Sequence, residues 1–191
     1  MKIDSVKVGR LRCNCYILDI DREVLVIDPG DEFEKIDKVI DNRKVVGIVI
    51  THHHFDHIGS VSEIVRKYKC RIYDRNNLVE GNNEIGKFKF EVIYTPGHKE
   101  DLITIYFKED KVMFTGDFIF KDTIGRCDLE GSSIEDMFNS IEKIKKYPRD
   151  IIIYPGHGIN TKLGYEIDNN IYFRDDAKYI WQGDKDNCFY K

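Results

Sequence analysis

The chain has 191 residues, of which 41% are hydrophobic and 34% charged, and its formal net charge is −4. This length suits one domain with a sizeable core, and the composition has the ordinary balance of a soluble protein. Because no long run of Lys or Arg is present, we expect no nucleic-acid partner.

Five cysteines are scattered along the chain, at positions 13, 15, 70, 127 and 188. An odd number in a chain of this size does not indicate a disulfide framework. The N-terminal stretch MKIDSVKVG lacks the apolar segment of a signal peptide, and no apolar run approaches the roughly 20 residues that a membrane span needs. We therefore expect a cytoplasmic protein without a membrane partner.

Apolar, β-branched runs bounded by turn residues predict the strands. In chain order, these runs cover residues 15–20, 23–30, 44–51, 71–74, 87–97, 102–117 and 150–156. The run over 102–117 is predicted to be a hairpin with its turn at Glu109-Asp110.

Apolar residues at helical spacing predict helices over residues 33–42, 60–68 and 132–147. Ser132-Ser133 followed by Glu135 predicts a capping box at the start of the last helix. The order of elements indicates two sheets covered by helices, and so an α/β fold. We expect one domain over residues 1–191, in which 172–191 can form a peripheral tail.

All six histidines follow the ends of predicted strands. Four lie in the stretch THHHFDH, Thr51–His57, while His98 follows TPG and His157 follows YPG. Asp28 and Asp117 close two further strands, EVLVID and KVMFTGD. Ligand sites in layered α/β folds lie at the carboxyl ends of strands, where loops converge. The pattern therefore predicts a folded metal site rather than a histidine-rich surface tract.

The spacing divides the predicted ligands into two groups. His52 and His54 are two residues apart and project to the same side of an extended segment, so His53 projects away as a bystander. One metal ion can be bound by His52, His54 and His98, and a second by Asp56, His57 and His157, with Asp117 as a bridge. Imidazole and carboxylate ligands suit zinc, iron or manganese, and seven ligands for two ions leave room for a bridging hydroxide.

Two further residues each have two interpretations. Asp28 can orient a ligand histidine from outside the metal site, or it can simply be a turn residue of DPG. Arg126, in IGRCD, can bind a substrate carboxylate, or it can form an internal salt bridge with Asp128. Neighbouring Cys127 can line the same region or be a small buried residue.

The ordered set THHHFDH, TPGH, TGD and YPGHG resembles the metallo-β-lactamase-fold hydrolase superfamily over about residues 28–164. The resemblance implies a four-layer αββα sandwich, with two mixed sheets and a dinuclear site in a groove at one edge. More narrowly, TGDFIFKDTIGRCDLEG and the segment 154–173 resemble the short bacterial glyoxalase II-like (hydroxyacylglutathione hydrolase-like) proteins. These proteins hydrolyse thioesters, typically S-lactoylglutathione.

That resemblance implies attack of hydroxide on a small-molecule thioester, with two divalent ions as cofactors, zinc first and iron or manganese as alternatives. It gives Asp56 and Asp117 a catalytic role, in which they orient the hydroxide and offset the metal charge. On this assignment Asp117→Ala loses metal and activity, whereas His53→Ala keeps both.

The sequence departs from the family pattern around the site. Asp101 and Leu102 stand where the family usually has Gly-Ser, and Ile159 and Ile171 replace prolines. The chain also ends too soon for the C-terminal helical domain with which full-length glyoxalase II binds glutathione. These departures leave the thiol carrier open, and the oligomeric state is open too.

Other functions share parts of this pattern. A persulfide dioxygenase-like enzyme would hold one iron with His52, His98 and Asp117. A hydrolase of another ester, lactone or phosphoester would use the same ligands. Zinc β-lactamases fit less well, because they usually lack the bridging aspartate and are exported. A non-catalytic metal-binding protein is disfavoured by the complete ligand set.

Overall fold

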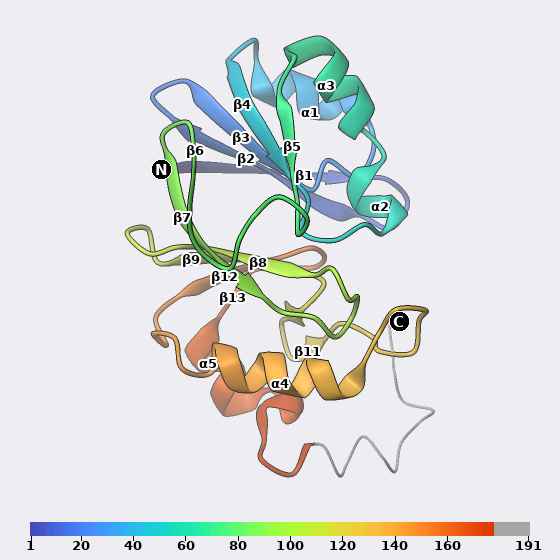
Figure 1. Cartoon of the computed structure of the whole chain (residues 1–191), viewed down its shortest axis with the longest axis vertical. Helices are drawn as coiled ribbons and strands as arrows, with labels where there is room; N and C mark the ends of the chain where they lie inside the picture. The colour runs from blue at the N-terminus through green and yellow to red at the C-terminus, as the bar shows by residue number, and fades with distance from the viewer. Residues whose placement is uncertain (178–191) are drawn as a thin grey trace.

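The computed structural model describes residues 1–177. These residues form two large sheets, a small two-stranded sheet of β10 and β11, and the covering helices (Figure 1). The strands are β1 (Lys2–Val8), β2 (Cys13–Ile20), β3 (Glu23–Ile27), β4 (Lys44–Val49), β5 (Arg71–Tyr73), β6 (Gly81–Ile85), β7 (Phe88–Tyr94), β8 (Ile103–Phe107), β9 (Val112–Gly116), β10 (Ile119–Phe120), β11 (Thr123–Ile124), β12 (Ile152–Pro155) and β13 (Thr161–Lys162). The helices are α1 (Phe33–Ile40), α2 (Phe55–Ile58), α3 (Val61–Tyr68), α4 (Ile134–Ile144), α5 (Leu163–Asn169) and the 3₁₀ helix η1 (Ile171–Phe173).

The first sheet has the strand order β1-β2-β3-β4-β5. Its first three strands pair antiparallel, whereas β3, β4 and β5 pair parallel. Because β3 and β4 run in the same direction, the segments that follow them leave the sheet at one edge. Those segments carry Asp28 and the stretch Thr51–His57.

The second sheet has the order β13-β12-β9-β8-β7-β6. Strands β12 and β9 pair parallel and the other pairs are antiparallel, so β7, β9 and β12 all point the same way. The loops after these three strands carry His98, Asp117 and His157. The topology thus places the three residues at one edge of the second sheet.

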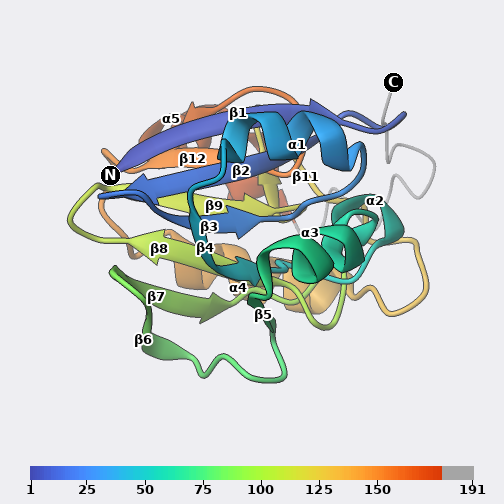
Figure 2. The same cartoon turned by 90° about the horizontal axis from the view of Figure 1, so that it is seen from above.

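Four layers make up the molecule, with α1 and α3 over the first sheet and α4 and α5 over the second (Figures 1 and 2). Each boundary between layers holds an apolar cluster. Ile36, Ile40 and Ile64 pack between helices and the first sheet, and Phe88 and Phe114 belong to the cluster between the sheets. This arrangement confirms the predicted α/β fold, a four-layer αββα sandwich with two mixed sheets.

The start of α4 differs from the prediction. Its N-cap is Ser133, whose hydroxyl oxygen accepts a hydrogen bond from the backbone N–H of Asp136 at 3.2 Å. The residue three positions after the cap is therefore Asp136, and the predicted use of Glu135 is wrong. The buried face of this helix carries Met137, Phe138 and Ile141.

The first part of the predicted peripheral tail packs into the protein. Phe173 and Ala177 are buried in the cluster beneath α4. The remainder of that predicted tail, 178–191, lies outside the described residues.

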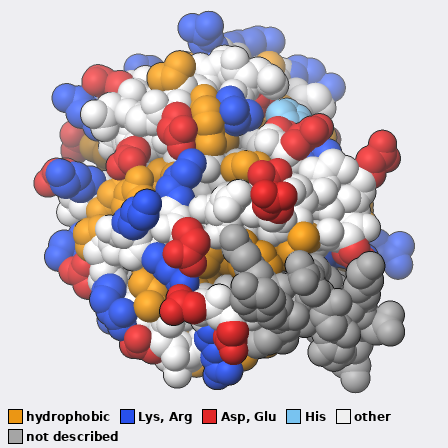
Figure 3. All heavy atoms as spheres, turned by 60° about the horizontal axis from the view of Figure 1, so that its bottom comes forward, with side chains coloured by type: hydrophobic (Ala, Val, Ile, Leu, Met, Phe, Trp, Pro, Cys, Tyr) orange, Lys and Arg blue, Asp and Glu red, His pale blue; other side chains and the backbone are white. Residues whose placement is uncertain are grey.

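Within residues 1–177, no helix has the length and apolar character needed to cross a membrane. On the face shown in Figure 3, acidic and basic side chains are interspersed.

Candidate metal centre

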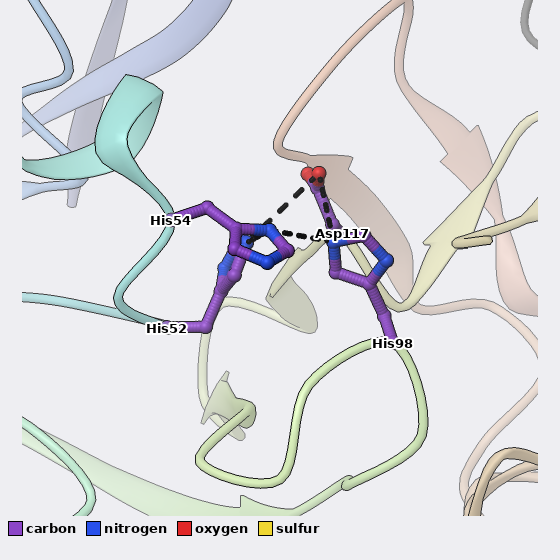
Figure 4. Close-up of side chains that lie close together, drawn as sticks. All are labelled: His52, His54, His98 and Asp117. Carbon is purple, nitrogen blue, oxygen red and sulfur yellow. Dashed lines mark hydrogen bonds and ion pairs between the residues drawn. The ribbon is translucent and has the colours of Figure 1, made fainter. Parts of the chain in front are cut away.

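One group of four residues meets at the edge of the sandwich. His52 and His54 come from the segment after β4, His98 from the loop after β7 and Asp117 from the end of β9, and their side chains point toward one another (Figure 4). His54 Nδ1 lies 3.1 Å from His52 Nε2 and 2.9 Å from His98 Nε2. Each residue offers one ligand atom, and all four atoms lie within 4.8 Å of one another. Nitrogens on one tetrahedral zinc ion are roughly 3.3 Å apart, so the spacing fits a shared cation.

The other predicted ligands gather on the opposite side of Asp117. His57 Nε2 lies 3.3 Å from Asp117 Oδ1 and 3.9 Å from Asp56 Oδ2. His157 Nε2 lies 3.2 Å from Asp56 Oδ2 and 3.6 Å from Asp117 Oδ2. Since Asp117 Oδ2 is also 3.5 Å from His98 Nε2, its carboxylate stands between the two groups. The structure therefore brings all seven predicted ligands together in the predicted division.

Two atoms at this point of contact are buried without a hydrogen bond. Among the described residues, His57 Nε2 and Asp117 Oδ1 have no hydrogen-bond partner. Leaving a buried polar group unpaired costs about 1–3 kcal/mol. A bound cation would satisfy both atoms, and their chemistry, imidazole nitrogen and carboxylate oxygen, fits a divalent metal ion.

Outer hydrogen bonds orient the ligand rings so that one nitrogen of each faces the other ligands. A backbone carbonyl can only accept, so the Nδ1–H of His98 donates to Arg126 O at 2.8 Å and that of His157 donates to Leu11 O at 3.0 Å. In the neutral form of either ring, this leaves the lone pair on Nε2, the nitrogen that faces Asp117. Ring orientation by such outer contacts is typical of metal-binding histidines.

Asp28 and Thr51 orient two further rings, those of His57 and His52. The Thr51 hydroxyl donates to Asp28 Oδ2 at 2.6 Å, so its oxygen is free to accept from His52 Nδ1 at 3.2 Å. His57 Nδ1 donates to Asp28 Oδ2 at 2.9 Å, and the backbone N–H of Thr51 donates to Asp28 Oδ1 at 2.7 Å. Asp28 thus makes the contact with a ligand histidine that its predicted orienting role requires. Thr51 escaped the sequence analysis, although it begins the THHHFDH stretch.

Electrostatics separate the two groups. Burial lowers the pKa of His52, of His54 and of His98, which favours the neutral imidazoles that metals bind. Burial acts in the same direction on His57, but the carboxylates of Asp117 and Asp28 outweigh it and raise the pKa of His57 well above its usual value. In the metal-free protein this ring holds a proton where a cation would lie.

The acidic residues are held as carboxylates. Burial would raise the pKa of Asp117, but the facing ring of His57 outweighs it and holds that pKa well below its usual range. For Asp56 too, a hydrogen bond from His157 outweighs burial and lowers the pKa. Both residues are therefore negatively charged near neutral pH, as metal ligands must be.

Glycine is required where the backbone passes the ligands. A Cβ on Gly156, just before His157, would lie 2.2 Å from Asp117 Oδ1 and 2.8 Å from His57 Cε1. Any other residue there would displace the carboxylate between the two groups. In the sequence YPGH, the histidine is a predicted ligand, and the glycine lets the backbone pass close to Asp117 and His57.

Cys13 is a buried thiol that the sequence analysis did not connect with the site. Its Sγ lies 3.7 Å from His57 Nδ1, the ring edge that faces Asp28 rather than Asp117. Its Sγ, His57 and His157 could also hold an ion by proximity alone. Burial raises the pKa of Cys13 to about 11, so in the metal-free protein the thiol is neutral at pH 7. On the other edge of the ring, His57 Nε2 faces Asp117 and Asp56, the two carboxylates that His157 Nε2 also approaches.

The ligands open onto a cavity of about 410 Å³. Its floor is formed by His54, Asp56, His98, Asp117 and His157, and its walls by Leu11, Phe55, Arg126 and Leu129. The apolar wall residues are exposed, Phe55 to 75%. The sequence does not predict that these residues line a cavity, because single exposed apolar residues are common on protein surfaces.

Arg126 forms the predicted salt bridge with Asp128, and it also lines the cavity beside the ligands. Its guanidinium pairs with Asp128 through two hydrogen bonds of 2.6 Å, which is the predicted internal salt bridge. Its backbone carbonyl orients His98, a role that no side-chain pattern reveals. Cys127 is half-buried, and its thiol donates to Gly125 O at 3.5 Å.

Strand β2 ties down the loop that carries His157. Asn14 Nδ2 and the Tyr16 hydroxyl both donate to Pro155 O, at 2.9 and 2.6 Å, and the backbone N–H of Asn14 donates to Gly156 O at 2.7 Å. These bonds connect the first sheet to the end of β12 in the second. They fix the loop from the side opposite the cavity.

For Tyr16→Phe we expect the free energy of unfolding to fall by about 1–2 kcal/mol, because a buried carbonyl loses one of its donors. The ring and its packing against Phe114 and Tyr154 are kept. Urea unfolding of the metal-free protein measures the change. The matched control is Tyr165→Phe, which loses an exposed hydroxyl contact to Asp122 and should change stability by less than about 0.5 kcal/mol. Equal effects of the two variants would contradict this account of the loop.

Comparison with known proteins agrees with this geometry. The family model described as the metallo-beta-lactamase superfamily matches residues 8–76 and 73–157. The probable metallo-hydrolase YqgX of Bacillus subtilis is 32% identical over 203 residues, covering 89% of this chain and 96% of that protein. The hydroxyacylglutathione hydrolase GloC of Haemophilus influenzae is 30% identical over 207 residues, covering 89% and 97%.

Solved structures with the same fold are also close in sequence. The B3 metallo-β-lactamase BLEG-1 superposes with a TM-score of 0.86 at 28% identity, over 90% of this chain and 99% of that one. The protein TTHA1623, crystallised in a di-iron-bound form, superposes with a TM-score of 0.81 at 29% identity, over 87% and 98%.

Proposed function

The chain belongs to the metallo-β-lactamase superfamily of metal-dependent hydrolases, and from that premise we propose that it is a dinuclear enzyme that cleaves a thioester. The observation that carries the proposal is the position of Asp117. Its two oxygens face His57 on one side and His98 on the other, at 3.3 and 3.5 Å. One carboxylate that lies between two ligand groups can be shared by a pair of cations.

In this proposal His52, His54 and His98 hold one ion, and Asp56, His57 and His157 hold the other, with Asp117 shared. Two divalent cations, when bound, supply Lewis acidity and a water whose pKa is lowered toward about 7. The chain's own residues position the reaction. Asp56 is ionised and borders the cavity, so it can accept a hydrogen bond from the attacking water and orient it.

The walls of the cavity favour an uncharged acyl group beside the ligands. Leu11 and Leu129 approach from two loops and Phe55 from the start of α2, and together they can exclude bulk water from the scissile carbonyl. A thioester is the proposed substrate class because this chain is similar to the hydroxyacylglutathione hydrolase GloC over 97% of the length of GloC. Zinc is the proposed metal, since the ligands are imidazoles and carboxylates, with iron or manganese as alternatives.

The test is thiol release from S-lactoylglutathione and from acyl thioesters of a small neutral thiol, with the matching oxoesters and a β-lactam as comparison substrates. We expect thioester hydrolysis that stops on chelation and returns when zinc is restored. Hydrolysis of the β-lactam alone would replace the substrate class while leaving the metal chemistry. A single iron per chain with oxygen uptake and no thiol release would overturn the proposal in favour of a dioxygenase.

A further inference from the structure

His53 is the histidine of the THHHFDH stretch that turns away from the ligand groups. Its backbone N–H and its ring Nδ1 both reach Asp101 Oδ2, at 3.1 and 2.6 Å, and its Nε2 lies 3.3 Å from Asp74 Oδ2. As predicted, its ring points away from the metal ligands, and it contacts these two carboxylates instead. It joins three loops that are far apart in the sequence.

The contact with Asp101 spans the two sheets at the edge where the ligands lie. His53 sits between His52 and His54, in the segment after β4 of the first sheet. Asp101 follows His98 by three residues, in the loop between β7 and β8 of the second sheet. The first ligand group is divided between these same two segments.

Asp101 depends on His53 for its polar contacts. Within residues 1–177, the hydrogen bonds to its side chain both come from His53, and its other oxygen, Oδ1, is buried without a partner. A carboxylate held in this way is strongly coupled to its donors, because moving them would leave both oxygens unsatisfied. The sequence carries Asp101 where the family usually has glycine, and glycine has no side chain to make this contact.

We propose that His53 and Asp101 form a brace, defined by these two residues, which sets the distance between the segment of His52 and His54 and the loop of His98. A backbone hydrogen bond from Ile103 to Thr51, of 2.9 Å, ties the same segments where they leave the sheets. The brace ties them at the ligands themselves. Both members are positioning residues, and the inference rests on the proposed binding of metal by this group.

The test measures metal retained per chain while the zinc-loaded protein is equilibrated with increasing chelator. His53→Ala and Asp101→Ala should still bind two ions at saturating zinc, because neither residue is a ligand. We expect them to lose the ion held by His52, His54 and His98 at about tenfold lower chelator concentration than the unaltered protein. Tenfold is the lower end of the range for residues that support metal ligands. Asp101→Asn should fall between, since its amide oxygen can still accept from His53.

Two further measurements separate positioning from general stability. The double variant should be no weaker in retention than Asp101→Ala alone, because the two residues act as one unit. Asp150→Ala, which removes an exposed carboxylate paired with Lys111, should match the unaltered protein. Identical retention curves for all variants, or a change confined to the unfolding midpoint of the metal-free protein, would overturn the brace. Failure of the unaltered protein to bind metal would instead overturn the proposed function.

Discussion

Asp117→Ala abolishes metal binding and lowers kcat/KM by about 10³-fold or more, which is the largest effect that we expect of any single substitution. Its carboxylate is buried and lies within 4.0 Å of the rings of His52, His57, His98 and His157. The substitution removes a ligand from both groups at once. It also removes one of the two carboxylates that raise the pKa of His57. Each group then consists mainly of imidazoles, and less negative charge remains to offset the repulsion between two neighbouring cations.

Two companions make this result interpretable. Asp117→Asn keeps the shape of the side chain but removes its charge, so it should fold like the original and still bind at most one ion tightly. Asp150→Ala removes an exposed carboxylate and should retain full metal content and activity. Metal content by elemental analysis and initial rates of thioester hydrolysis are the measurements. An Asp117→Ala protein that keeps two ions would disprove the shared position of this carboxylate.

Asp28→Ala is expected to lower the free energy of unfolding of the metal-free protein by about 3 kcal/mol. The carboxylate is 2% exposed and accepts three hydrogen bonds, two from Thr51 and one from His57. All three donors lose their acceptor in the variant. The backbone adds to the cost, because Asp28 has a φ of 49°, a conformation that aspartate tolerates better than alanine.

The same substitution should weaken metal binding by about 10–100-fold, since His57 loses its contact with Asp28 and the Thr51 hydroxyl that orients His52 loses its acceptor. Asp122→Ala is the matched control for the backbone term. Asp122 also has a positive φ, of 65°, but it is exposed and lies at the turn between β10 and β11. Urea unfolding and chelator competition should separate the two variants. If Asp122→Ala were as damaging as Asp28→Ala, the φ angle rather than the hydrogen bonds would explain the loss.

The site could be predicted from the sequence because its ligands are attached to strong local patterns. Buried strands of Val and Ile read clearly, and each predicted ligand follows such a strand within a few residues. The parallel directions of β3 with β4 and of β9 with β12 then bring these ends to common edges. The elements that escaped prediction have weak patterns. Strand β6, GNNEI, is mostly polar, and the short helix α5 buries only Leu163 and Glu166.

The support of the site could not be read in the same way. Two of the ring-orienting acceptors are backbone carbonyls, of Leu11 and Arg126, and a carbonyl is present at every residue. The partners His53 and Asp101 are 48 residues apart, and the residues around either one do not predict contact with the other. Such contacts are fixed only by the relative placement of the two sheets, which periodicity does not encode.

The number of metal ions bound per chain tests the central claim most directly. Protein freed of metal, then saturated with zinc and separated from excess, should contain two ions per chain by elemental analysis. The two should be lost together, or nearly so, in Asp117→Ala. One ion per chain at saturation, or two ions that both persist without Asp117, would contradict a dinuclear site organised around that carboxylate.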